Sequence, residues 1–454
     1  MTEKENKMGT MSIGKLLVTM SGPAIVSMLI NALYNIVDSI FVAQIGEDAL
    51  TAVSIVFPIQ MLIICVAVGT GIGINSFMSR KLGAKQQKEA EAAASNGVKL
   101  AIFNWIIFAT IGILFAGPFV KMFSDDPNII SYGTTYLTIV STFSLFLNGS
   151  IIIEKIFQAT GNMIIPMITI SISAVTNIVL DPILIFGLVG FPKLGIAGAA
   201  IATVFAQFLG MMIGLYILIT KNHAIKFTLR GKINFDIIKE IYKVGFPSIV
   251  MQSLVSIMIF AMNSILITFS STAVAVLGIY GKVQSFVFMP CFGVNQGALP
   301  IIGYNYGAGD KKRMFSCYKI GIIMSVGIMF VGLLVFQLVP DLLLKMFNAS
   351  PEMLAIGVPA LKAISWCFVP AGFGIITAGL FQATGHGMMS MWGGIIRQFA
   401  GTIPLAFIFG KLFGLKMVWY AFAAAEILGT IYYLIMLKYI NEKTFKKMEC
   451  VTNE

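Results

Sequence analysis

The pentapeptide Phe157-Gln-Ala-Thr-Gly161 recurs unchanged as Phe381-Gln-Ala-Thr-Gly385, 224 residues further along the chain. At the same offset the sequence aligns with itself without a gap from Lys15/Lys239 onward to this pentapeptide. Other identical pairs at this offset are Pro23/Pro247, Gln60/Gln284, Gly69/Gly293, Gly73/Gly297, Gly83-Ala84/Gly307-Ala308 and Lys88/Lys312. Agreement of this kind indicates an internal duplication, so the fold is expected to consist of two homologous halves.

The composition places both halves in a membrane. Of 454 residues, 57% are hydrophobic and 11% are charged, against about 45–50% apolar and about 25% charged in soluble domains. The 44 Gly and 15 Pro are spread among long apolar runs rather than gathered in a polar tract, which excludes disordered and collagen-like chains. We therefore expect an all-α polytopic membrane protein.

Twelve apolar segments reach the length of about 20 residues that a transmembrane helix needs. They are residues 16–43, 50–77, 95–118, 129–160, 164–187, 194–219, 240–268, 274–300, 315–340, 354–382, 388–410 and 416–438. Each half holds six segments, an even number, so the two halves enter and leave the membrane on the same side. The sequence thus predicts twelve transmembrane helices in two parallel six-helix repeats.

The basic residues predict the orientation of these helices. The net charge is +11, with 31 Lys and Arg, and most of these lie in both tails and in the loops after even-numbered segments. The loops after odd-numbered segments hold five: Lys121, Lys193, Lys345, Lys411 and Lys416. By the positive-inside rule both termini are cytoplasmic. Because the basic excess is explained by topology and by anionic lipids, no nucleic-acid partner is expected.

The expected organisation follows from the repeat and the charges. Residues 1–220 form a first lobe of six helices, 221–239 a cytoplasmic linker, 240–438 a second lobe and 439–454 a cytoplasmic tail. Parallel repeats of this kind are a design of secondary transporters, in which the substrate site lies between the repeats. A duplicated static scaffold or a channel is the alternative.

Acidic residues inside the spans are the candidates for function, because an ionisable group near the bilayer centre costs about 2.5–3.5 kcal/mol on insertion scales. Asp38 shares one helical face with Asn31, Tyr34 and Asn35. Asp181 ends a polar row at four-residue steps that contains Thr169, Ser173 and Asn177. Both helices run outward, and the two carboxyl groups, together with Thr203 on the sixth span, are expected at similar depth.

These aspartates are confined to the first half. The repeat partner of Asp38 is Met262, and Asp181 falls opposite Ile403 or Pro404 once a small gap is allowed. A residue that the shared fold required would appear in both halves, so a functional role is favoured over a structural polar knot. Two carboxylates close together in a low dielectric cannot both ionise cheaply, so one is expected to hold a proton. The same oxygens could instead bind sodium.

The other charges inside the spans are expected to be mainly structural. Arg397 and Glu426 lie near the middle of neighbouring spans, which predicts an ion pair that locks the second half. Glu154 is assigned either to a structural pair or to the cavity. Lys155 follows it directly, and because adjacent helical residues point about 100° apart, we expect Lys155 to reach the cytoplasm rather than to face Glu154.

No enzyme chemistry is indicated. The chain has no Walker A loop, so no ATPase subunit is implied, and its two histidines are far apart. No catalytic triad or metal-ligand spacing is found, and the five cysteines are scattered. We therefore expect no catalytic residue, no resident metal and no cofactor besides a coupling proton or Na⁺.

The sequence resembles the multidrug and toxic compound extrusion (MATE) family over essentially its whole length. The motifs that carry the resemblance are Tyr34-Asn-Ile-Val-Asp38-Ser-Ile-Phe with Gly46, Ala49 and Ala52, Ser79-Arg-Lys-Leu-Gly83-Ala, Asn177-Ile-Val-Leu-Asp181-Pro-Ile-Leu-Ile-Phe-Gly187 and Gly195-Ile-Ala-Gly-Ala-Ala-Ile-Ala-Thr203. One subgroup of that family has a Glu on the seventh helix and an Asp on the tenth. This chain has neither, which favours the DinF/MepA-type bacterial subgroup.

The resemblance implies two six-helix lobes around a central V-shaped cleft and export of amphipathic, often cationic, compounds in exchange for protons or Na⁺. The residues that match the family's coupling cluster are Asp38, Asn177, Asp181 and Thr203. Candidates for substrate contact are Asn31, Tyr34, Asn35, Gln60, Gln284 and Glu154. The expected setting is a monomer in the cytoplasmic membrane. A flippase for a lipid-linked precursor is the alternative function.

Overall fold

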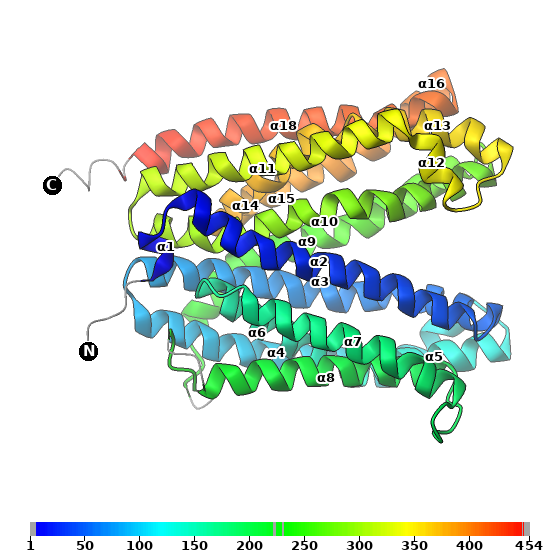
Figure 1. Cartoon of the computed structure of the whole chain (residues 1–454), viewed down its shortest axis with the longest axis horizontal. Helices are drawn as coiled ribbons and strands as arrows, with labels where there is room; N and C mark the ends of the chain where they lie inside the picture. Colours follow the sequence, from blue (N-terminus) through cyan, green and yellow to red (C-terminus); the bar gives the residue numbers. More distant parts are fainter. Residues whose placement is uncertain (1–5, 221–223, 229–230, 447, 449–454) are drawn as a thin grey trace. The chain divides into compact units, whose positions relative to one another are not determined.

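A computed structural model describes residues 6–220, 224–228, 231–446 and 448, and within these ranges all regular structure is helical (Figure 1). The helices before the linker are α1 (Lys7–Thr10), α2 (Ile13–Ala43), α3 (Glu47–Gly83), α4 (Gln87–Lys121), α5 (Pro127–Thr142), α6 (Ser144–Ala159), α7 (Ile164–Phe186) and α8 (Ile196–Thr220). Those after it are α9 (Phe235–Leu266), α10 (Ser271–Gly307), α11 (Lys311–Leu338), α12 (Pro340–Lys345), α13 (Pro351–Ser365), α14 (Phe368–Ala383), α15 (Gly387–Gly394), α16 (Ile403–Phe413), α17 (Leu415–Val418) and α18 (Tyr420–Ile440), with π-helices η1 (Ile395–Thr402) and η2 (Asn441–Phe445). The predicted all-α class is confirmed.

The predicted number of spans agrees with these helices. Ten helical segments of the described residues are long and apolar enough to cross a membrane, and two bent pairs, α5 with α6 at 45° and α13 with α14 at 46°, bring the number to as many as twelve. Both bent spans begin with the same type of N-cap, followed by a proline, at positions that the repeat relates. Asp126 before Pro127 and Ser350 before Pro351 accept hydrogen bonds from backbone N–H groups of the first turn.

The chain forms two compact units. The N unit comprises Val26–Leu82 and Gln86–Ile249, and the C unit comprises Met1–Ile25, Gly83–Lys85 and Val250–Glu454. The boundaries therefore fall inside α2 and α9 rather than at the ends of these helices. The expected lobes, divided at residues 220 and 240, follow the repeat in the sequence and stay a prediction.

Close contacts at glycines explain why the first part of α2 belongs to the C unit and the first part of α9 belongs to the N unit. In the N unit, a Cβ on Gly73 of α3 would lie 2.2 Å from the carbonyl oxygen of Ile241 on α9. In the C unit, a Cβ on Gly297 of α10 would lie 2.5 Å from Ser21 Oγ on α2. The same relation holds one turn earlier for Gly69 with Ile249 and for Gly293 with Ile25. Small residues let helices approach closely, and the repeat places these contacts in register in both units.

Each unit has its own apolar core. In the N unit, buried side chains of α3, α4, α5 and α8, such as Val56, Val120 and Tyr136, form one cluster. In the C unit a larger cluster around Phe336 and Phe368 includes Met262 of α9, which is fully buried. The position equivalent to Asp38 is thus occupied by a core residue in the second half.

Candidate functional site

Two aspartates of the N unit meet among its helices. Asp181 on α7 is fully buried and Asp38 on α2 is half-buried. Their carboxyl groups lie close enough together to interact electrostatically. One oxygen of Asp38, Oδ1, is inaccessible and has no hydrogen-bond partner among the described residues. The structure therefore brings the two predicted residues together as a carboxyl pair.

Asn177 and Thr203 complete this group. The Asn177 amide, one helical turn before Asp181, lies 3.3 Å from Thr203 Oγ1 on α8. The amide orientation that satisfies both neighbours has Nδ2 donating to Asp181 Oδ2 at 3.0 Å and the amide oxygen accepting from the backbone N–H of Thr203 at 3.2 Å. Both side chains are buried. We call Asp38, Asp181, Asn177 and Thr203 the carboxyl cluster.

The chemistry of the carboxyl cluster follows from its inventory of donors. An ionised carboxylate only accepts hydrogen bonds, so a hydrogen bond between Asp38 and Asp181 requires a proton on one of them. Removing that proton would leave two negative charges in contact inside an apolar bundle, which is costly unless a cation replaces it. The described residues hold no group of three or more His, Cys, Asp and Glu side chains that could bind a metal ion. A proton or a cation between the two carboxyl groups would relieve that repulsion.

Two tyrosines and a glutamine surround the carboxyl cluster. Tyr34 precedes Asp38 by one turn and lies close enough to interact electrostatically with both aspartates. Tyr136 of α5 is 3% exposed and lies close enough to Gln60 of α3 and to Asp38 to interact with both. The sequence analysis selected Tyr34 and Gln60 but missed Tyr136. Its position in the polar run Gly133-Thr-Thr-Tyr136, at the start of an otherwise apolar span, is the signal that could have found it.

Three other substrate-contact candidates are Asn31, Asn35 and Gln284. Asn35 Nδ2 donates to both the backbone carbonyl and the side-chain oxygen of Asn31, each at 2.8 Å, and both residues are exposed. Gln284 is half-buried on α10 of the C unit. Their roles in substrate contact stay a prediction.

Glu154 forms a structural pair, which is one of the two roles predicted for it, but its partner is Lys155, which was expected to point elsewhere. Lys155 Nζ lies 3.1 Å from Glu154 Oε1, and Gln158 Nε2 donates to the same oxygen at 2.6 Å. Lys155 is 6% exposed, so the expectation that it reaches the cytoplasm is wrong. The reason is Gly71 on α3, where a Cβ would lie 2.7 Å from Lys155 Cγ. The absence of a side chain there admits the Lys155 stem, whose flexibility brings the ammonium group back to its neighbour.

The C unit contains the predicted ion pair. Arg397 Nη1 lies 3.2 Å from Glu426 Oε1, with 20% and 13% of the two side chains exposed. Arg397 belongs to η1, where Thr402 Oγ1 donates to its backbone carbonyl. The prediction of an ion pair in the second half is confirmed. Glu426 is thereby neutralised by an arginine, unlike the acids of the carboxyl cluster.

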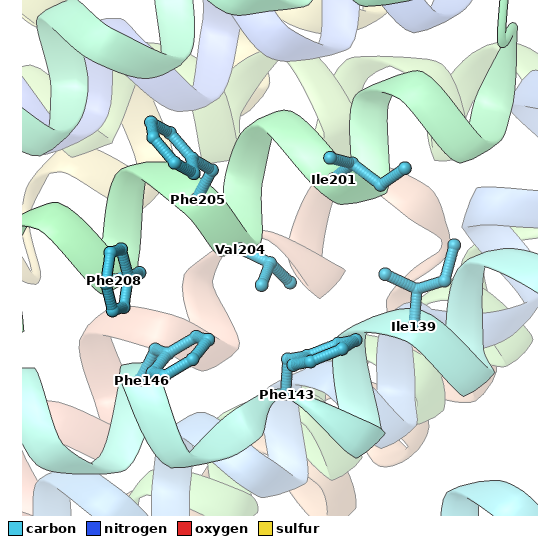
Figure 2. A pocket seen from close by; sticks show the side chains of 7 residues that line it. All are labelled: Ile139, Phe143, Phe146, Ile201, Val204, Phe205 and Phe208. Carbon is cyan, nitrogen blue, oxygen red and sulfur yellow. The ribbon is translucent and has the colours of Figure 1, made fainter.

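An apolar pocket of about 370 Å³ lies between α8 and the bend that joins α5 and α6 (Figure 2). Phe143 and Phe146 at the bend between α5 and α6 point toward Val204 on α8. The other lining residues are Ile139, Ile201, Phe205 and Phe208. Val204 follows Thr203 directly and so points to another side of the helix. The lining has no polar side chain, so this pocket offers no counter-charge to a cation.

Buried ionisable groups within a duplicated bundle of spans are characteristic of secondary membrane transporters. Comparison with known proteins shows which kind this is. The MatE family model matches residues 23–183 and 247–408, two segments that begin 224 residues apart, as the internal repeat requires. The chain therefore belongs to the MatE family, the multidrug and toxic compound extrusion transporters, and the resemblance seen in the sequence is confirmed.

Relatives and solved structures agree with this assignment. The multidrug export protein MepA of Staphylococcus haemolyticus is 27% identical over 450 residues, which cover 98% of this chain and 97% of that protein. The probable multidrug resistance protein YoeA of Bacillus subtilis is 26% identical over 89% of each chain. A structure described as the outward-facing conformation of a multidrug resistance MATE family transporter matches with a TM-score of 0.92 at 25% identity, covering 98% of this chain and all of that one.

Proposed function

We propose that the protein exports amphipathic organic cations in exchange for protons, and that the carboxyl cluster couples the two movements. The observation that carries the proposal is the proximity of the carboxyl groups of Asp38 and Asp181 in the N unit. Membership of a transporter family and the names of the MepA relatives support drug export. The charge distribution supports a cytoplasmic position of both termini in the cell membrane.

The proposed exchange is an alternation between two states of the pair. With one proton shared between Asp38 and Asp181, the pair carries a single negative charge and the cluster is held together. When the proton leaves, the second charge makes the site attractive to an organic cation, and a proton arriving from outside displaces that cation. A charge that moves down the membrane potential yields about 2.3 kcal/mol per 100 mV. Exchange of one proton for one monovalent cation moves no net charge, so it is driven only by the pH gradient.

Sodium is the alternative coupling ion for the same residues. Carboxylate, amide and hydroxyl oxygens are the ligands that hard cations prefer, and Oδ1 of Asp38 is an oxygen without a partner among the described residues. Asp181, Asn177 and Thr203 would supply the other oxygens. A sodium ion would then take the place of the shared proton.

The experiment is ethidium transport by the purified protein in liposomes with either an acidic lumen or a sodium-loaded lumen. We expect accumulation driven by the pH gradient in the wild type and none in Asp38→Asn. Asp125→Asn is the matched control, because Asp125 is exposed in the loop before α5 and should leave transport unchanged. Dependence on sodium would retain export and change the ion. Full transport by Asp38→Asn would refute coupling through the carboxyl cluster.

The flippase alternative has less support from the side chains. A pyrophosphate-linked lipid needs free cationic groups, and the candidates within the spans are Arg397, Lys282 and Lys362. Arg397 is paired with Glu426, and the Lys282 ammonium lies 6.0 Å from the centre of the Phe347 ring. Failure of both gradients to move ethidium would make the flippase the better proposal.

A further inference from the structure

A second polar pocket, of about 230 Å³, lies in the N unit between α4 and the segment that joins the two halves of the chain. It is lined by Lys88, Glu91, Ala92, Ser95, Lys226, Thr228, Gly231 and Lys232. The α4 residues among them, at positions 88, 91, 92 and 95, follow the i, i+3, i+4, i+7 pattern of one helix face. The volume is several times the roughly 30 Å³ that a water molecule occupies in the liquid. The pocket therefore has room for a small polar group.

The joining segment is fixed to α4 on both sides of the pocket. On one side, Gln87 Nε2 donates to the carbonyl of Ala224 at 2.7 Å. On the other, Lys99 Nζ donates to the carbonyl of Gly231, and the backbone N–H of Asn234 donates to Asn96 Oδ1 at 3.1 Å. These bonds connect residues more than 130 positions apart. The pocket is consequently a built feature of the N unit.

The charge of the lining favours an anion. Three lysines, Lys88, Lys226 and Lys232, face one carboxylate, Glu91. Glu91 Oε1 already accepts from the backbone N–H of Lys226 at 2.9 Å and from Gln87 Nε2 at 3.2 Å. The lysine ammonium groups are thus in excess at the rim.

Ser95 provides an unused donor inside the pocket. It is 2% exposed, and its Oγ has no hydrogen-bond partner among the residues that the structure describes. A buried hydroxyl without a partner is costly, so such a group is normally satisfied. Gly231 keeps the hydroxyl open, because a Cβ at this position would lie 3.0 Å from Ser95 Oγ. The missing partner belongs in the pocket.

We propose that this pocket binds a phosphate group, with the Ser95 hydroxyl donating to one phosphate oxygen and the lysines neutralising the charge. The group could belong to an anionic phospholipid, whose head group is abundant at the cytoplasmic surface, or to a free phosphate. The site lies outside the carboxyl cluster, and it stands whether or not the proposed proton coupling is correct.

The test is binding by the purified full-length protein in detergent. In the lipid arm, native mass spectrometry measures how much phosphatidylglycerol, compared with phosphatidylcholine, stays bound. In the soluble arm, ³¹P NMR measures the line broadening of inorganic phosphate added to delipidated protein. The variants are Ser95→Ala, which removes only the hydroxyl, and the double variant Lys226→Gln/Lys232→Gln. The control is Lys312→Gln, the repeat-related counterpart of Lys88, which is exposed on α11 of the C unit.

We expect Ser95→Ala to weaken binding about tenfold in whichever arm detects it, as for loss of one hydrogen bond to a charged group. The double lysine variant should weaken it further, and Lys312→Gln should leave it unchanged. An effect confined to phosphatidylglycerol identifies a lipid head group, and an effect on inorganic phosphate identifies a free anion. Binding in both arms that is unaffected by the pocket variants, or reduced equally by Lys312→Gln, would overturn the proposal. Unchanged thermal unfolding of Ser95→Ala shows that the variant is folded.

Discussion

The two units solve the burial of acidic groups in different ways. In the N unit, Asp38 and Asp181 lie close to each other, with amide and hydroxyl groups from Asn177 and Thr203 around Asp181. In the C unit, Glu426 is paired with Arg397. A carboxylate held by an arginine has its charge compensated permanently, whereas two carboxyl groups in contact need a proton or a cation that comes and goes. Under the proposed function, one unit of the duplicated fold would contain the pair that exchanges ions and the other a pair that stabilises the protein.

The repeat shows that the fold does not require the acids. Met262 occupies the position equivalent to Asp38 and is fully buried in the core of the C unit. The helix carrying it, α9, has the same glycine-mediated contact in the N unit that α2 has in the C unit. The backbone arrangement is therefore retained while the side chain changes from carboxylate to thioether.

Packing around the second span of each half, α3 and α10, shows a similar reversal of residue size. In the N unit, Gly71 leaves space for Lys155. At the equivalent positions of the C unit the small and large residues are reversed, since a Cβ on Gly379 would lie 1.9 Å from Asn295 Oδ1. The helix pair stays close in both halves, but only the first half acquires a buried cation there.

The largest expected effect comes from moving the acid to the other unit. In Asp38→Met/Met262→Asp, we expect gradient-driven ethidium transport to fall to the level of protein-free liposomes, because the new carboxylate would enter an apolar core without the Asp181 partner. Met262→Asp alone should also destabilise the protein by several kcal/mol, as expected for an unpaired buried charge. Recovery of transport in the double variant would show that a carboxyl group in either half can couple ethidium transport to the gradient.

A double-mutant cycle on Arg397 and Glu426 tests whether that pair is structural. Arg397→Met alone should lower the free energy of unfolding by about 3–5 kcal/mol, whereas Arg397→Met/Glu426→Leu should come close to the wild type. Unfolding titrations in mixed micelles give these values. Transport should persist in the double variant. Its loss, in a protein that remains stable, would place the pair in the transport machinery and remove the contrast between the units.

Two glycines test the close helix contacts. Gly73→Ala should lower the free energy of unfolding by about 1–3 kcal/mol, because the new Cβ would meet the Ile241 carbonyl of α9. Gly278→Ala on α10, where a Cβ would have no described atom within 4 Å, should raise it by up to about 1 kcal/mol through helix propensity. The same titrations measure both. Equal effects of the two substitutions would contradict the assigned contact.

The smallest effect is expected from two buried threonines. Thr203→Val removes a hydroxyl beside Asn177 and should change the pH at which transport is half-maximal, with a rate loss of about fivefold, as for one hydrogen bond. Thr377→Val removes a hydroxyl that contacts Tyr318 OH at 2.9 Å in the C unit. The Thr377→Val substitution should change the free energy of unfolding and leave the pH dependence of transport unchanged. A shift of the pH dependence of transport in Thr377→Val would show that residues of the second half also take part in coupling.

What the sequence could predict depended on periodicity. The spans, the duplication and the polar faces of α2 and α7 all follow from residue spacing, which predicted Asp38 and Asp181 at similar depth. The grouping of these residues with Asn177 and Thr203 in one cluster followed from the family resemblance. Lys155 could not be placed in this way, because its burial depends on a missing side chain on another helix, Gly71. Nor does hydropathy indicate which neighbour each half of a long helix packs against, so the unit boundaries inside α2 and α9 came only from the structure.

The two buried ion pairs also differ in how the chain can enter a bilayer. Each charge costs about 2.5–3.5 kcal/mol at the centre of an inserting helix. Glu154 and Lys155 lie on one helix, so they can neutralise each other as soon as α6 has formed. Arg397 and Glu426 lie on consecutive spans and can pair only when both are present. The last two spans of the protein therefore have reason to insert during biosynthesis as a hairpin, each supplying the counter-ion of the other.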